Sequence, residues 1–152
     1  MQIITTTNLN EARKQVDKLR KEDKKIVIMS QDDEFNRKAL EIKGLSRLVI
    51  NENLNQKDYM KQRSSGLNEI LAKICADKKI EVGIDIKAII SKTDAEKARA
   101  LARLAQNIML CKKAGAKLVF IGDVKDRLAL QSVMSVLGAS TEQAKEAAQT
   151  FL

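Results

Sequence analysis

The sequence predicts an α/β fold built on a parallel sheet. Short runs rich in Ile, Val and Leu alternate with longer segments in which apolar residues recur every three to four positions. The run at 25–30, KIVIMS, is almost continuously apolar, which is typical of a strand covered on both faces of a parallel sheet. Strands that alternate with helices over long connections pair in parallel through right-handed crossovers.

Five strands are expected, each a β-branched or aliphatic run. They are expected at 2–6, 25–30, 48–50, 80–86 and 117–121. The fourth alternates Ile80, Val82, Ile84 and Ile86 with polar or small residues, as in a strand with one apolar face. A short apolar turn then leads into the next helix.

Helices are expected between and after the strands. The first is capped by Asn8 or Asn10, and the third begins near Ser64 or Ser65. The helix that ends near Lys113 is the longest. Its predicted buried residues are Ala98, Leu101, Leu104, Ala105, Ile108 and Cys111, and its predicted exposed residues are Arg99, Arg103, Gln106 and Asn107. The fifth helix has the inward-facing set Leu130, Val133, Met134 and Leu137, and a last helix is capped by Ser140.

The longest irregular segment is the polar loop at 51–65. It contains no proline, and no glycine occurs until Gly66. Loops of this length inside a compact domain are either functional or disordered.

Composition limits the classes of protein that the chain can belong to. Its 152 residues suggest a single domain, 1–152, with an aliphatic core, because only 3% of the residues are aromatic. The net charge of +8 favours a polyanionic partner, nucleic acid first, although a basic protein with no such partner has the same composition. The absence of histidine removes the usual general base, and with only two cysteines it argues against a zinc site.

The cysteines and the hydropathy pattern bear on location. Cys75 and Cys111 lie on apolar helix faces, which favours reduced core thiols in a cytoplasmic protein over a disulfide. No run of about twenty apolar residues occurs, so no membrane association is expected.

Two carboxylates stand where α/β enzymes place working residues. Asp85 and Asp123 follow the fourth and fifth predicted strands. They would either hold Mg²⁺ or cap the helices that follow, and capping is the commoner role. The glycines are scattered singly, so no phosphate-binding loop is indicated.

Two segments resemble one known family. They are RSSGLNEILAK at 63–73 and RALARLAQNIMLCKK at 99–113, with a looser match at 126–145. In order and spacing they resemble the archaeal ribonuclease P protein component 3 family, whose eukaryotic relative is the thirty-kilodalton ribonuclease P subunit. The family usually has an additional segment ahead of the part that aligns, so the chain is expected to be an N-terminally short member.

The resemblance implies a fold and a function. The family folds as a TIM-like barrel, and because eight units need about 200 residues or more, a reduced or incomplete barrel of about five or six βα units is expected here. The implied function is that of a ribonuclease P subunit that supports the catalytic RNA during 5′-leader removal from precursor tRNA. The implied partners are that RNA, protein component 2, other protein subunits and, indirectly, precursor tRNA.

The resemblance also implies that catalysis belongs to the RNA. Mg²⁺ is then held by the RNA, and the protein binds no cofactor and is not catalytic by itself. Similar barrels in metal-dependent phosphoesterases use histidine-rich sites, and this sequence has no histidine.

Basic and polar residues are the predicted RNA contacts. With few aromatic side chains, contact with phosphates and 2′-hydroxyls is expected rather than base stacking. The candidates are Arg63, Lys87, Arg99, Arg103, Asn107, Lys112, Lys113, Lys125 and Arg127. Arg99 and Arg103 either touch RNA or hold the Arg63 loop through its carbonyls. Lys112 and Lys113 either touch RNA or complement the helix dipole.

Two other functions remain open. One is a protein-interaction scaffold in which the arginines are structural. The other is a stand-alone metal-dependent phosphoesterase that uses Asp85 and Asp123.

Overall fold

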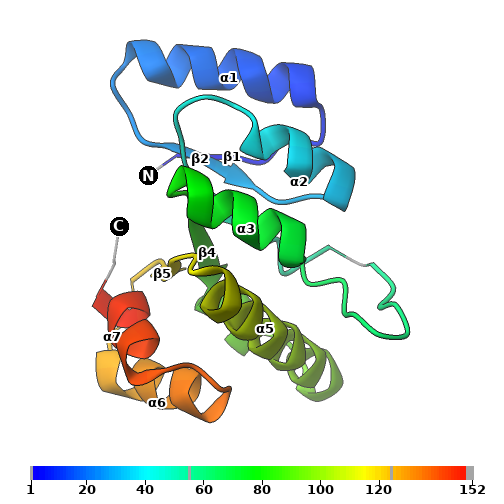
Figure 1. Ribbon diagram of the computed structural model, residues 1–152, viewed down its shortest axis with the longest axis vertical. Coiled ribbons are helices and arrows are strands. Elements are labelled where there is room, and N and C mark those ends of the chain that lie inside the picture. The colour runs from blue at the N-terminus through cyan, green and yellow to red at the C-terminus, as the bar shows by residue number, and fades with distance from the viewer. Residues whose placement is uncertain (1, 55, 124, 150–152) are drawn as a thin grey trace.

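A computed structural model describes residues 2–54, 56–123 and 125–149 (Figure 1). In these residues, five parallel strands form one sheet in sequential order. The strands are β1 (Ile3–Ile4), β2 (Ile26–Met29), β3 (Leu45–Val49), β4 (Glu81–Asp85) and β5 (Leu118–Ile121). The α/β class and the parallel sheet are therefore confirmed, and each strand falls at or beside its predicted range. β3 starts earlier than expected because Leu45 already pairs with Ile26.

Helices occupy the connections between strands and the segment after β5. They are α1 (Leu9–Lys21), α2 (Asp33–Leu40), α3 (Glu69–Lys78), α4 (Ile86–Ile90), α5 (Asp94–Ala114), α6 (Arg127–Val136) and α7 (Thr141–Gln149). Asn8 caps α1, as one of the two expected choices. α3 begins later than the sequence suggested, because the side chain of Asn68 accepts the Leu71 N–H at 2.9 Å. α4 forms where a short apolar turn was expected.

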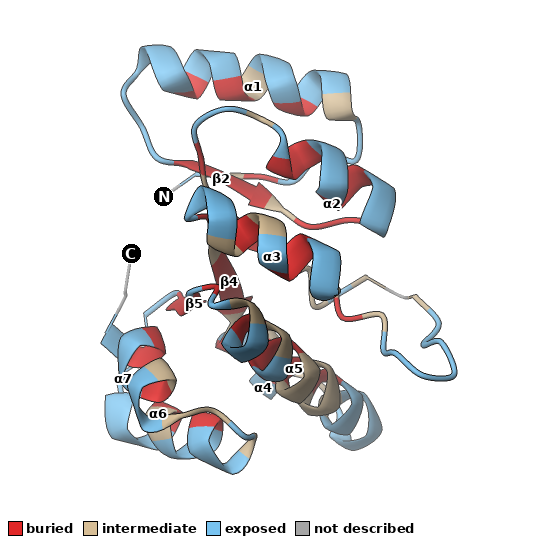
Figure 2. Ribbon diagram, viewed as in Figure 1, coloured by how far each residue is buried: buried red, intermediate tan, exposed pale blue. Residues whose placement is uncertain are grey.

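The helices cover one face of the sheet. Ile28, Leu48, Val82 and Phe120 point from successive strands into a core that they share with the inner faces of the helices. Figure 2 shows these buried faces turned toward the sheet and the exposed faces turned outward. The opposite face of the sheet carries a separate cluster of Val27, Val49 and Ile121, to which no residue of a described helix contributes.

The buried faces of α5 and α6 differ from the prediction. Ala98 is exposed, whereas Ala100 and Asn107 are buried. α5 is thus rotated about its axis so that the side chain of Asn107 faces inward, where it forms hydrogen bonds with Ser65 of the connection between β3 and α3. On α6, Val133 is 37% exposed rather than buried.

Two further expectations concern the thiols and the membrane. Cys75 and Cys111 are buried and unbonded, and burial raises the pKa of both to about 12, as expected for inert core thiols. No helix in the described part of the chain is both long and apolar enough to cross a membrane.

The parallel arrangement gives the molecule two distinct ends. β1 and β2 start at the left of Figure 1, and α1, α2, α3 and α5, which return from the strand ends, end beside the strand starts. The connection from β3 to α3 projects at the right, beyond the ends of these strands.

Candidate functional site

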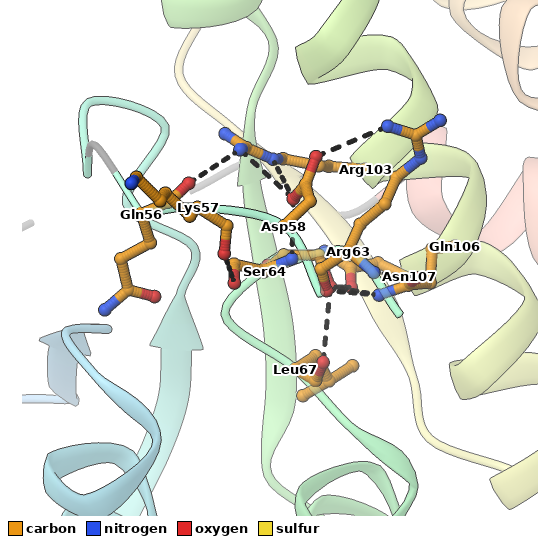
Figure 3. A network of polar contacts seen from close by, with 10 residues as sticks. Gln56, Lys57, Asp58, Arg63, Ser64, Leu67, Arg103, Gln106 and Asn107 are labelled. Carbon is orange, nitrogen blue, oxygen red and sulfur yellow. Dashed lines mark hydrogen bonds and ion pairs between the residues drawn. The ribbon is translucent and has the colours of Figure 1, made fainter. Parts of the chain in front are cut away.

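The connection between β3 and α3, residues 50–68, lies at the strand ends. Its described residues contain no helix or strand, as predicted for 51–65. A set of polar contacts nonetheless ties it to α5 (Figure 3). These contacts involve both segments on which the family resemblance rests.

Asp58 is the centre of the charged contacts. It accepts the Ser64 N–H at 2.8 Å and contacts Arg103 Nη2 at 3.2 Å and Arg63 Nη1 at 3.4 Å. Burial by itself raises the pKa of Asp58, but the Ser64 amide and the two guanidinium groups outweigh it and hold the pKa below its usual range. Arg103 also donates to the carbonyl of Gln56 at 3.1 Å. One arginine of α5 therefore fixes two points of the loop.

Two amide side chains of α5 hold the next part of the loop. Gln106 accepts the Arg63 N–H at 2.9 Å and donates to the Arg63 carbonyl at 2.8 Å. Asn107 accepts the Ser65 hydroxyl at 2.6 Å and donates to the Ser65 carbonyl at 3.0 Å. The full set, which we call the loop clasp, is Asp58, Arg63, Ser65, Arg103, Gln106 and Asn107.

Gly66 lets the chain turn at the clasp. Its φ is +79°, and a Cβ atom there would lie 3.1 Å from Ser30 Oγ and 3.2 Å from Ile50 Cδ1. Its carbonyl accepts the side-chain amide of Asn36, which is fully buried, at 3.2 Å. Both backbone conformation and space therefore favour glycine after the paired serines.

A cavity of about 350 Å³ lies beside the clasp. Its lining includes Glu52, Lys92, Arg99 and Arg103. Burial and nearby Asp85 raise the pKa of Glu52 to about 7, although Lys92 and Arg103 oppose the shift. Arg99 is exposed and makes no ion pair with any described residue, so its charge faces the cavity and the solvent.

The carboxylates that follow the strands do not form a metal centre in the described residues. Asp85 accepts the Ala88 N–H at 3.0 Å and so caps α4. Asp123 is exposed after β5. No group of three or more Cys, Asp or Glu side chains suited to a metal ion occurs among the residues that the structure describes.

The predicted RNA contacts fall into three groups. Arg63, Arg99 and Arg103 lie together at the strand ends. Lys87, Lys125 and Arg127 are exposed on segments that follow strands at the same end. The others are Asn107, which is 1% exposed, and Lys112 and Lys113, which lie in the last turn of α5. Lys113 pairs with Glu69 at 2.8 Å.

Two roles were considered for Arg103, contact with RNA and holding the Arg63 loop, and its contacts match the second. Its guanidinium bonds a loop carbonyl and Asp58, which corresponds to holding the loop. Asn107 is enclosed in the clasp, so we leave it out of any RNA surface.

Sequence reasoning missed Asp58, Ser65, Gln106 and Asn36 as functional positions. For Asp58 a signal existed, because it is the single acidic residue between Lys57 and Arg63. A lone carboxylate in a basic loop is a natural partner for arginines on a neighbouring helix.

Curated proteins with similar sequences share one description. Ribonuclease P protein component 3 of Methanosarcina acetivorans is 32% identical over 94 residues, which cover 58% of this chain and 39% of the relative. The protein of the same description from Methanococcus vannielii is 28% identical over 135 residues, covering 89% of this chain and 55% of the relative. That from Methanocaldococcus jannaschii is 26% identical over 129 residues, covering 85% and 53%. No family model matches the chain.

A solved structure shares the fold. A chain in the cryo-EM structure of archaeal ribonuclease P with mature tRNA superimposes with a TM-score of 0.77 at 22% identity, covering 97% of this chain and 63% of that one. This chain spans about half the length of the curated relatives it matches, or less, between 31% and 55%. The resemblance that the two motifs predicted is confirmed: the chain is similar in sequence to archaeal ribonuclease P protein component 3.

Proposed function

We propose that this chain is a protein subunit of ribonuclease P that supports the catalytic RNA in 5′-leader removal from precursor tRNA. One observation carries the proposal. The two segments on which the family resemblance rests, 63–73 and 99–113, meet in the loop clasp. The similarity to component 3 therefore involves residues that form one network, and not only a shared core.

The chemistry of the chain suits a supporting role. The net charge of +8 favours binding to RNA, whose phosphates repel each other when its helices pack. In this proposal the RNA holds the catalytic Mg²⁺, and the protein lowers the Mg²⁺ concentration that the fold of the RNA requires. The partners are the ribonuclease P RNA, protein component 2 and other subunits, with precursor tRNA contacted indirectly. We expect the particle in the cytoplasm.

We further infer that the sheet is part of an open barrel of the TIM type. Sequential order of parallel strands with helices on one face is the arrangement of such a barrel. The separate cluster of Val27, Val49 and Ile121 would then line the interior.

Reconstitution tests the proposed function. Ribonuclease P RNA, component 2 and the remaining subunits are combined with and without this chain, and cleavage of precursor tRNA is followed across a Mg²⁺ series. The chain is expected to shift the Mg²⁺ requirement to lower concentration, and to cleave nothing when RNA is omitted. An unchanged Mg²⁺ requirement would contradict the proposal that the chain supports the RNA of the particle.

A scaffold for protein partners is the second candidate. It is favoured by the outer face of α6, where Leu128 is 74% exposed and Val136 is 86% exposed. Capture of component 2 by the chain without RNA, together with no salt-sensitive RNA affinity, would favour the scaffold over the RNA-supporting role. Leu128→Ser should then weaken the capture.

A further inference from the structure

A basic surface lies at the strand starts, at the opposite end of the sheet from the loop clasp. A cavity of about 880 Å³ there is lined by Lys24, Lys25, Arg47, Lys79 and Glu81, among others. A smaller cavity of about 290 Å³ shares Lys79 and Glu81 and adds Lys117. Both cavities therefore border Lys79 and Glu81. We call Lys24, Lys25, Arg47, Lys79 and Lys117 the lysine rim.

Part of the charge on this rim is not neutralised by any described residue. Lys25 and Lys79 are exposed and make no ion pair with any residue in the described ranges. Glu81 is shared by two cations, because Arg47 Nη2 lies 2.6 Å and Lys117 Nζ 3.4 Å from its carboxylate oxygens. Lys24 pairs with Glu22 at 2.6 Å. Among the described residues, cations thus outnumber carboxylates at the rim.

Arg47 gives the rim a fixed geometry. Its side chain is 4% exposed, and its Nε and Nη2 atoms both donate to Glu81 Oε2. Its stem lies over Gly83, where a Cβ atom would come within 3.0 Å of Arg47 Cδ. Burial alone raises the pKa of Glu81, but Arg47 and Lys117 reverse the effect and lower it, so this carboxylate stays charged and holds both cations in place.

The helix dipoles at this end do not cancel the basic charge. Four helices, α1, α2, α3 and α5, end here, and each C-terminus carries about half a negative charge, or roughly −2 in total. The basic residues in their last turns that make no ion pair with a described residue are Lys18, Lys21, Arg37, Lys78 and Lys112. These residues already exceed the dipole charge, and the rim adds to them.

The strand ends differ. Arg63 and Arg103 are bound to Asp58, and Glu52 adds a carboxylate beside Arg99. The acidic side chains of Asp32, Asp85 and Asp126 cap helices that begin at this end. A polyanion is therefore attracted more strongly to the strand starts than to the end that carries the motif arginines.

We propose that the phosphate backbone of RNA docks on the lysine rim at the strand starts. This inference rests on the proposed function, since it assigns the surface that the RNA partner uses. Long, exposed lysines contact phosphates without reading bases, so binding is independent of sequence and weakens steeply with salt.

Paired charge reversals at the two ends test the assignment. The rim variant is Lys25→Glu with Lys79→Glu, and the matched variant at the strand ends is Lys87→Glu with Arg99→Glu. Both change the net charge equally at exposed positions. Each chain is titrated against a fluorescent RNA duplex of generic sequence, between about 50 and 200 mM salt.

The rim variant is expected to lose affinity at least about tenfold at low salt and to lower the salt slope by about two, one for each phosphate contact removed. The variant at the strand ends should stay within about threefold of the unmodified chain. If the strand-end variant loses affinity and the rim variant does not, the assignment is wrong. Circular dichroism checks folding, and Lys25→Gln with Lys79→Gln should weaken binding in the same direction if the glutamate variant is unstable.

The failure of the proposed function has a different signature. If the unmodified chain binds no duplex even at the lowest salt, the chain does not contact RNA, and both the proposed function and the assignment to the rim are wrong. Equal loss in both variants would show a diffuse electrostatic effect and would also overturn the assignment to the rim.

Discussion

At the strand ends, Arg63 and Arg103 both contact Asp58, whereas at the strand starts Lys25 and Lys79 contact no carboxylate among the described residues. The arginines belong to the motifs that carry the family resemblance, but their guanidinium groups are engaged in hydrogen bonds and ion pairs with the loop. The two lysines belong to no motif, but their charges remain available to bind an anion. A basic residue in a family motif can therefore serve the fold, while the binding charge lies elsewhere.

Two glutamates show the same contrast. Glu81 lies between Arg47 and Lys117. Burial raises the pKa of Glu81, but these two cations lower it by more, so that the pKa is below its usual range. Glu52 at the other end is desolvated without a direct ion pair in the described residues, and its pKa is raised to about 7. One carboxylate is held in its charged form and the other is pushed toward its neutral form, so the two ends respond oppositely to pH.

The largest expected effect is at the clasp. Asn107→Ala removes the amide donor of the Ser65 carbonyl in a buried site, while the Ser65 hydroxyl keeps its bonds to the Leu67 carbonyl and Gln106 Nε2, and the change should lower the free energy of unfolding by about 2–3 kcal/mol. Urea denaturation measures the change. Met109→Ala on the exposed side of the same helix is the control, and it should change stability by less than about 0.5 kcal/mol. Equal effects of the two changes would mean that the clasp does not hold the loop.

The next effect depends on pH. Because the folded-state pKa of Glu52 is raised, its ionisation destabilises the fold progressively as pH rises from about 4.5 to about 7. Glu52→Gln should therefore be more stable than the unmodified chain by about 2 kcal/mol at pH 8, and the gap should close near pH 5. Denaturation at the two pH values measures it, and a gap that does not depend on pH would contradict the raised pKa.

A change at the strand starts tests how rigid the rim is. Gly83→Ala places a methyl group about 3.0 Å from both Arg47 Cδ and Val49 Cγ2. Overpacking of this kind should cost about 1–2 kcal/mol. The same change introduced into Val49→Ala should cost less, because one of the two crowded atoms is gone. Equal costs in the two backgrounds would show that the sheet face relaxes freely.

The smallest effect is at the charged part of the clasp. Asp58→Asn should lower stability by about 1 kcal/mol at pH 7, since the site is partly exposed. The lowered pKa means that the gap between the two chains disappears as pH falls below about 4. Trypsin should also cleave the loop faster at Lys57, Lys61 or Arg63. Asp94→Asn, an exposed change on α5, is the control and should leave the cleavage rate unchanged.

Much of the fold followed from local patterns. The five strands and the irregular loop were predictable because each has its own signature of aliphatic runs or polar residues. The burial of Asn107 was not, since helical periodicity places an amide on the polar face. Only the carbonyl and hydroxyl of Ser65, 42 positions away, make it an inner residue.

The candidate site was predictable only in part. The motif placed Arg63 near Arg99 and Arg103, and the structure brings these segments together. The lysine rim gave no local signal, because Lys25, Lys79 and Lys117 come from separate connections that meet only when parallel strands align their starts. Nothing in a single segment marks such a surface.

Lysine acetylation followed by mass spectrometry, with and without ribonuclease P RNA, tests most directly which end binds. Lys25 and Lys79 are predicted to lose reactivity when RNA is bound, while Lys87 at the strand ends keeps its reactivity. Protection of Lys87 with Lys25 and Lys79 still reactive would contradict the claim that the unpaired cations at the strand starts, and not the end that carries the motif arginines, meet the RNA.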